Sequence, residues 1–250
     1  MKAIQSNIIF FICRFVILLL FSCTEEDQGG PPQPPAPPPS INNGLVGFYS
    51  FEGNADDLSG HNFHGSVNGA TPTANRHGSP NAAYRFDGKD DYISLGNVEE
   101  MSFGGFEDYT LAAWVQPAMG EGGTNIIVSK WNGGVLAGWY LAVTPEGNAI
   151  SYRNVVPWTA RSAVSISSGE FVHLITSYDG EKRELYLYIN GVLAETAPFT
   201  SQPHDRQTPV LIGALHSRHD VSGFYEGVID EVRIYDRLLS SEEITYLAEN

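Results

Sequence analysis

From residue 44 onward the sequence is a series of short runs rich in Val, Ile, Tyr, Phe and Thr, separated by Gly, Asn and Asp. Such runs with turn residues between them predict β-strands, and the chain shows almost no helical periodicity. Many strands in succession predict an all-β fold, a two-sheet antiparallel sandwich, and no break within residues 44–250 suggests a second domain. The runs are LVGFYSF (45–51), YTLAAWVQP (109–117), NIIVSKW (125–131), GWYLAV (138–143), FVHLITSYD (171–179), ELYLYI (184–189), PVLIG (209–213) and FYEGVIDEVRIYD (224–236).

Local signals add one hairpin and one helix. Asn190 and Gly191 tolerate positive φ and predict a two-residue turn after ELYLYI. In that strand the leucines alternate with Tyr186 and Tyr188, so the leucines are expected in the core and the tyrosines on the outer face. At the end of the chain, SSEEITYLAEN has the spacing of a capping box and then an apolar face, which predicts a short C-terminal helix.

The N-terminus carries an apolar run, residues 8–22, that Arg14 interrupts and that is short for a membrane span. We interpret residues 1–22 as an export signal. The stretch LFSC resembles a bacterial lipobox, which implies cleavage before Cys23 and attachment of lipid to that cysteine. An ordinary secretory signal followed by a chance cysteine is the alternative.

Residues 23–43 are predicted to be an acidic and proline-rich linker. Seven prolines within residues 31–39 favour the extended polyproline II form, so this segment is expected to act as a stalk or as a disordered leader. The acidic cluster at residues 25–27 resembles a tag that marks lipoproteins for the outer surface. The localisation predicted from these segments is an outer membrane lipoprotein exposed on the cell surface.

Net charge and cysteine content limit the kinds of partner and of covalent cross-link that the chain can have. The formal net charge of −15 disfavours binding to nucleic acid and to anionic lipid, so the membrane is expected to be contacted only through the lipid anchor. The two cysteines are Cys13 and Cys23, and removal of the signal would leave one thiol and no internal disulfide.

Five stretches together are similar to the bacterial laminin-G-like domains of the concanavalin A-like lectin and glucanase superfamily. This resemblance implies a jelly roll of about a dozen strands with one concave sheet. It implies less about function, because the superfamily contains lectins, adhesion modules and glycoside hydrolases. The stretches are GLVGFYSFEGNADDLSGHNFHG (44–65), AYRFDGKDDYISL (83–95), YTLAAWVQP, GEFVHLITSYDGEKRELYLYINGVL (169–193) and GVIDEVRIYDRLLSSEEI (227–244).

The resemblance also implies a metal site. Strand alternation places Asp230 on the face of Val228, Val232 and Ile234, where a carboxylate needs a counter-charge. An arginine could supply it. Related domains instead imply a structural calcium ion held by Asp57, the Gly60 carbonyl and Asp230. A metal-free turn in the loop FEGNADDLSGHNFHGS (51–66) is the alternative, and the acids of FDGKDDY (86–92) are simplest as turn formers.

Three classes of function are compatible with this superfamily: catalysis, carbohydrate binding and protein binding. The chain lacks the ExDxxE strand motif of laminarinase-like hydrolases and the motifs GxSxG and HExxH, so we predict a non-catalytic protein rather than a glycoside hydrolase. The resemblance implies a module that binds carbohydrate, with Trp158, Arg161 and Trp131 as the ligand-binding candidates. Ordinary packing of these tryptophans, and a protein-binding adhesion or scaffold domain, are the competing interpretations.

Overall fold

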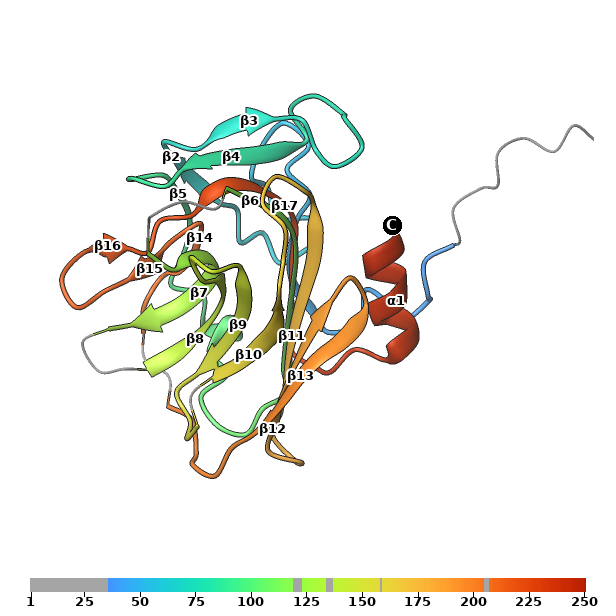
Figure 1. Cartoon of the computed structure of the whole chain (residues 1–250), viewed down its shortest axis with the longest axis vertical. Coiled ribbons are helices and arrows are strands. Elements are labelled where there is room, and N and C mark those ends of the chain that lie inside the picture. Colours follow the sequence, from blue (N-terminus) through green and yellow to red (C-terminus); the bar gives the residue numbers. More distant parts are fainter. Residues whose placement is uncertain (1–35, 119–122, 134–136, 158, 205–206) are drawn as a thin grey trace, which may run out of the picture. The chain divides into compact units, whose positions relative to one another are not determined.

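The computed structural model describes residues 36–118, 123–133, 137–157, 159–204 and 207–250. Residues 35–250 form one compact unit. The described residues fold into two antiparallel sheets and one short C-terminal helix, which confirms the predicted all-β, two-sheet jelly-roll sandwich (Figure 1). Cys23 and the predicted signal peptide lie outside the described residues. Within the described part of the chain, no helix has the length and apolarity needed to cross a membrane.

One layer is an eight-stranded sheet in the order β13-β12-β11-β6-β17-β4-β3, with β1 also paired to β17. Its long central strands, β6 and β17, are antiparallel neighbours, so the middle and the end of the sequence lie side by side. The strands are β1 (Leu45–Tyr49), β3 (Thr71–Thr73), β4 (Ala83–Asp87), β6 (Tyr109–Pro117), β11 (Val172–Asp179), β12 (Glu184–Ile189), β13 (Val192–Pro198) and β17 (Glu226–Tyr235).

The facing layer is a nine-stranded sheet in the order β10-β9-β8-β7-β14-β5-β2, extended by a β15–β16 hairpin beside β7. A single 3-10 turn, Glu99–Met101, follows β5. The strands are β2 (Ser66–Asn68), β5 (Tyr92–Gly96), β7 (Asn125–Asn132), β8 (Ala137–Val143), β9 (Asn148–Arg153), β10 (Thr159–Ser165), β14 (Val210–Ile212), β15 (Leu215–His216) and β16 (Val221–Ser222).

The core lies between the sheets and follows the alternation of the strands. Leu185 and Leu187 are fully buried in it, and Tyr186 and Tyr188 of the same strand are partly exposed, as predicted. Trp139 is also fully buried and donates its indole N–H to the Met101 carbonyl at 3.1 Å.

Helix α1 (Ser241–Glu249) covers the outer face of the eight-stranded sheet (Figure 1). Ile244 and Leu247 pack there against Ala112 and Ile175 in a second apolar cluster. The helix begins with the predicted capping box: the Ser240 hydroxyl accepts from the Glu243 amide, and the Glu243 carboxylate accepts from the Ser240 amide. The capping box therefore fixes where this cover begins.

The segment before β1 belongs to this cover. Ile41 is 4% exposed and lies in the second apolar cluster. Arg237 donates to the carbonyls of Ser40 (2.8 Å) and Asn43 (2.6 Å). Residues 38–43, which were predicted to belong to the linker, are thus packed on the sandwich. The sequence did not indicate this packing, because a single isoleucine among polar residues gives no strand or helix pattern.

Candidate functional site

One buried carboxylate organises the loop after β1. Asp57 is 5% exposed, and its two oxygens accept four hydrogen bonds. The donors are the amides of Phe48 (3.0 Å), Ser59 (2.9 Å) and Phe63 (3.0 Å) and the Ser59 hydroxyl (2.8 Å). Burial alone would raise the pKa of Asp57, but these hydrogen bonds outweigh it and hold the pKa below its usual value. Asp57 can therefore shape this loop without an ion.

Asp230 is buried, as predicted, but among different neighbours. Ile229, Val232 and Ile234 all belong to the main core, and the pairing of β17 with β6 shifts register between Asp230 and Arg233. This bulge, at which Glu231 has φ +47°, reverses the alternation. The prediction that Asp230 shares a face with Val232 and Ile234 is wrong, because strict period-two alternation does not survive a bulge.

The counter-charge of Asp230 comes from an arginine. Arg76 Nη1 lies 2.7 Å from Asp230 Oδ2, and the two side chains are 8% and 1% exposed. The guanidinium also lies over the Trp114 ring, 4.8 Å from its centroid. Burial raises the pKa of Asp230 to about 6, although Arg76 lowers it. Arg76 is thus the arginine that sequence considerations allowed as the counter-charge of Asp230.

The predicted calcium ligands do not share one network. Asp57 accepts hydrogen bonds from β1 and from its own loop, and Asp230 is paired with Arg76. The Gly60 carbonyl accepts a 3.4 Å hydrogen bond from the Asn62 side chain. A calcium ion is bound by six to eight oxygens that converge on it. Asp57 and Asp230 thus each have a partner within the protein, and calcium binding by Asp57, Gly60 and Asp230 stays a prediction.

Elsewhere among the described residues, three carboxylates approach one another in the turn between β4 and β5. Ligand oxygens of Asp87, Asp90 and Asp91 lie within 4.8 Å of one another. Two of these residues already act within the turn: Asp91 accepts from the Asp87 amide (2.9 Å), and Asp87 accepts from the Lys89 amide (2.9 Å). These contacts are the turn-forming role predicted from the sequence.

Three aromatic side chains meet on the outer face of the nine-stranded sheet. The rings of Tyr140 and Tyr152 stack at 4.6 Å with an interplanar angle of 9°. The Trp131 ring stands edge-on to both, at 5.9 and 4.7 Å. Trp131 and Tyr152 are 7% and 6% exposed, and Tyr140 is more open. We call this cluster the aromatic face.

Strand register sets this arrangement. Tyr152 pairs with Tyr140 across β9 and β8, and Tyr140 pairs with Ser129, two residues before Trp131 on β7. Paired residues and residues two apart share one side of a sheet, so all three rings project the same way. The burial of Tyr140 and Tyr152 raises their pKa values, that of Tyr152 to about 12, so both hydroxyls stay neutral near pH 7.

Arg161 lies on the same side of this sheet. It pairs with Ile150 on β9, two residues before Tyr152. Its Nη2 donates to Asn148 Oδ1 (2.7 Å) and Glu146 Oε2 (3.2 Å), and its side chain is 51% exposed. The structure therefore brings two of the predicted ligand-binding residues, Trp131 and Arg161, onto one face.

The third predicted residue, Trp158, lies outside the described residues, one position before β10. The sequence analysis missed Tyr140 and Tyr152, although alternation in GWYLAV and its neighbour could have identified them. Their gathering depends on the pairing of β7, β8 and β9, which alternation within one strand does not give.

Two facing antiparallel sheets with these crossovers define the jelly-roll class of β-sandwich. A family model for laminin G-type domains of the concanavalin A-like lectin/glucanases superfamily matches residues 87–245, more than half of the chain. The chain belongs to this superfamily. Comparison with curated protein sequences gives no significant match.

Solved structures share the fold at low sequence identity. Domain 4 of AbnA, a GH43 extracellular arabinanase from Geobacillus stearothermophilus solved in complex with arabinotriose, aligns with a TM-score of 0.63 at 21% identity, covering 82% of this chain and 98% of that one. The binding domain of Paraclostridial Mosquitocidal Protein 1 aligns at 0.67 and 18% identity, covering 83% and 52%. Botulinum neurotoxin type C, described as entering cells through two ganglioside molecules, aligns at 0.65 and 12% identity, covering 84% and 52%. The chain thus spans about half of the two toxin structures.

Proposed function

We propose that this protein is a non-catalytic module that binds carbohydrate on its aromatic face. The observation that carries the proposal is the cluster of Trp131, Tyr140 and Tyr152 on the outside of a sheet, with the exposed Arg161 on the same side. The superfamily and the solved complex of an arabinanase domain with arabinotriose support a sugar as the ligand class.

The chemistry of this face suits a neutral sugar. Aromatic rings bury the C–H surface of a sugar ring, and Tyr140 is the most open of the three. Arg161, Asn148 and Glu146 provide donors and acceptors for hydroxyl groups beside the rings. The net charge of −15 would repel an acidic polysaccharide. Trp158 directly precedes β10 and is proposed as a further stacking residue.

Acid–base chemistry is not favoured on this face. Glycoside hydrolysis uses a general acid with a raised pKa, paired with a second carboxylate. Glu146, the carboxylate that contacts Arg161, has a lowered pKa because Thr144 and Arg161 hydrogen-bond to it. A carboxylate held in its ionised form is suited to accept hydrogen bonds from a ligand rather than to protonate a leaving group.

The test is a glycan array probed with the wild-type chain and with Tyr140→Ala. We expect binding of neutral glycans by the wild type and a roughly tenfold or greater loss in the variant, because stacking and burial of one ring contribute about 1–2 kcal/mol. Phe106→Ala is the matched control, since Phe106 is an exposed aromatic residue in a loop outside the aromatic face. Equal binding by all three proteins would refute the site, and absence of any glycan signal would refute the function.

The same array, run with and without calcium, tests the metal prediction. Asp57 accepts four hydrogen bonds, and Asp230 is paired with Arg76 through Oδ2, but Asp230 Oδ1 has no hydrogen-bond partner among the described residues. A calcium requirement could therefore arise at Asp230, at another ligand set or with the sugar itself. A chelator that abolishes binding would establish calcium as a cofactor. Unchanged binding together with an unchanged melting temperature would contradict the calcium prediction.

We also propose that lipid on Cys23 anchors the protein to the outer membrane at the cell surface. Residues 38–43 pack beside α1, on the layer opposite the aromatic face, so attachment through the linker leaves that face clear (Figure 1). In a bacterial host, labelled palmitate is expected to enter the wild type and Cys13→Ser but not Cys23→Ser. Label retained in Cys23→Ser would exclude this anchor, and a domain protected from protease on intact cells would contradict surface exposure.

A further inference from the structure

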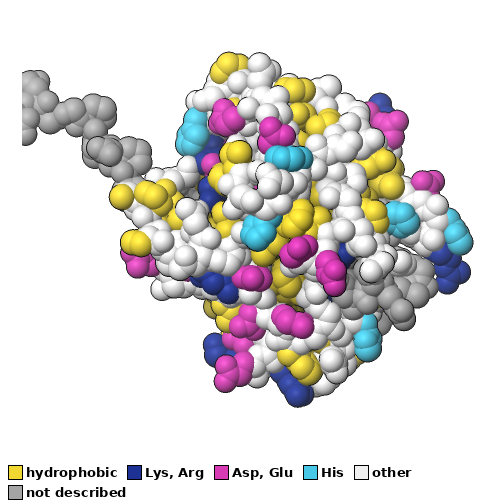
Figure 2. Space-filling model, turned by 180° about the vertical axis from the view of Figure 1, so that it is seen from behind, with side chains coloured by type: hydrophobic (Ala, Val, Ile, Leu, Met, Phe, Trp, Pro, Cys, Tyr) yellow, Lys and Arg dark blue, Asp and Glu magenta, His cyan; other side chains and the backbone are white. Residues whose placement is uncertain are grey.

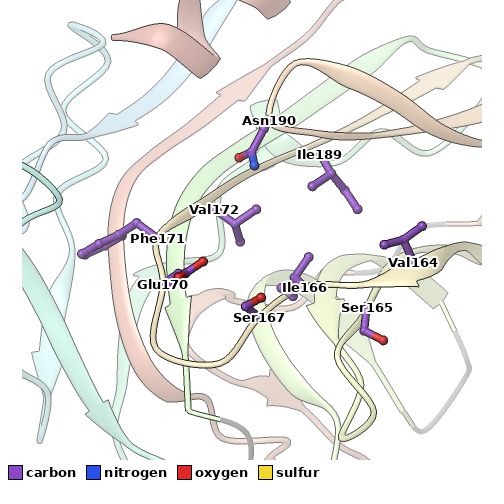
Figure 3. A pocket seen from close by; sticks show the side chains of 9 residues that line it. All are labelled: Val164, Ser165, Ile166, Ser167, Glu170, Phe171, Val172, Ile189 and Asn190. Atoms are coloured by element: carbon purple, nitrogen blue, oxygen red, sulfur yellow. The ribbon is translucent and has the colours of Figure 1, made fainter.

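A cavity opens where the two sheets end side by side. It has a volume of about 220 Å³ and lies between the end of β10, the segment that leads into β11, and the turn between β12 and β13 (Figure 3). That is far more than the roughly 10–15 Å³ that one water molecule needs. It involves none of the residues of the aromatic face.

The floor of this cavity is the open end of the hydrophobic core. Ile166 and Val172 are 8% and 6% exposed and belong to the main core, against which Ile189 also packs. Val164 at the rim is 70% exposed, as is Val192, which pairs with Ile189 across the hairpin. Exposed valines that continue a buried apolar surface indicate a place where a ligand's aliphatic part is buried.

One side of the opening carries a carboxylate. Figure 3 shows Glu170 and Ser167 on that side, and Ile189 and Val164 across from them. Glu170 is exposed, and within the part of the chain that the structure describes it makes no salt bridge. Asn190 is held by the neighbouring strand β11, because its Oδ1 accepts from the His173 amide at 2.8 Å. The carboxylate is thus the charged acceptor that this cavity offers a ligand.

We propose that this cavity binds a lysine side chain presented by a partner protein. The four methylenes of lysine match the apolar floor, and its ammonium group would meet Glu170 at the polar side. The charge of the whole molecule agrees, because a net charge of −15 attracts basic partners over a longer range. Figure 2 shows acidic side chains spread over the face that it presents.

The probe for this proposal is Nα-acetyl-lysine methylamide, titrated into the isotopically labelled full chain and followed by amide resonances. We expect shifts confined to residues 164–172 and 189–192, with millimolar affinity because a single exposed ion pair is weak. Glu170→Gln should weaken binding about fivefold. The norleucine analogue, which has the aliphatic chain without the ammonium group, should bind similarly weakly to both proteins.

The matched control is Glu181→Gln, which removes an equally exposed carboxylate in the turn between β11 and β12 and should leave the affinity unchanged. The spectra report the fold of each variant directly. Three results would overturn the proposal: no shift at these residues, equal affinity of lysine and norleucine probes for the wild type, or an equal loss in both glutamine variants. None of them bears on sugar binding at the aromatic face.

Discussion

Replacing Arg76 by leucine is expected to lower the free energy of unfolding by about 3–5 kcal/mol at pH 7. The guanidinium is the charge partner of Asp230, and that carboxylate is 1% exposed between the sheet and the residues that cover it. Removal of Arg76 leaves a buried charge without compensation, which costs far more than loss of a surface ion pair. Urea denaturation of the wild type and the variant measures the difference.

The pH dependence of the stability loss in Arg76→Leu shows whether the uncompensated charge of Asp230 causes it. Burial raises the pKa of Asp230 to about 6 in the folded protein, above its usual value of 3.8. Between about pH 4 and pH 6 the folded state therefore keeps a proton that the unfolded state has lost, and this group's contribution to stability falls as pH rises. At pH 5 Asp230 is mostly protonated in both proteins, so the loss in Arg76→Leu should shrink to about 1–2 kcal/mol.

Arg218→Leu is the control, because it removes an exposed arginine and should change stability by less than about 0.5 kcal/mol. The double variant Arg76→Leu with Asp230→Leu should recover much of the loss, since both buried charges disappear together. An equal loss at pH 5 and pH 7 would show that packing, rather than the uncompensated carboxylate, sets the effect.

The fold was predictable because its signals are local. Alternation in ELYLYI assigned Leu185 and Leu187 to the core, and the spacing of Ser240 and Glu243 assigned the start of the helix. Each signal depends on residues a few positions apart. The bulge at Glu231 marks the limit of this reasoning, because one extra residue in β17 reversed the face of every later side chain.

The candidate site was only partly predictable, because its parts meet through sheet register. Trp131 and Arg161 lie on different strands, and only the pairing of β7 through β10 shows that they share a side. Arg76 and Asp230 are 154 positions apart, and the arginine lies in a loop without periodicity. A buried carboxylate predicts that a counter-charge lies nearby, but strand alternation does not identify the residue that supplies it.

A second large effect concerns the cover on the opposite side of the sandwich. Glu243 is 1% exposed and makes a bidentate ion pair with Arg237, with oxygen–nitrogen distances of 2.7 and 2.9 Å. Arg237 also donates to the carbonyls of Ser40 and Asn43. One ion pair thus joins the helix, the end of β17 and the segment through which the linker enters the domain.

Glu243→Gln is expected to lower stability by about 3 kcal/mol at pH 7, because hydrogen bonds from Arg237 and Ser240 lower the pKa of Glu243 to about 2. A lowered pKa contributes stability that is fully present above pH 4.5 and is lost as pH falls toward 2, so the two proteins should converge at low pH. Glutamine can still form the capping box, so this substitution removes the charge of Glu243 without removing the helix cap. Glu242→Gln, an exposed acid in the same turn, is the control. If both glutamine variants lose stability equally, the helix dipole rather than the Arg237 pair accounts for the effect.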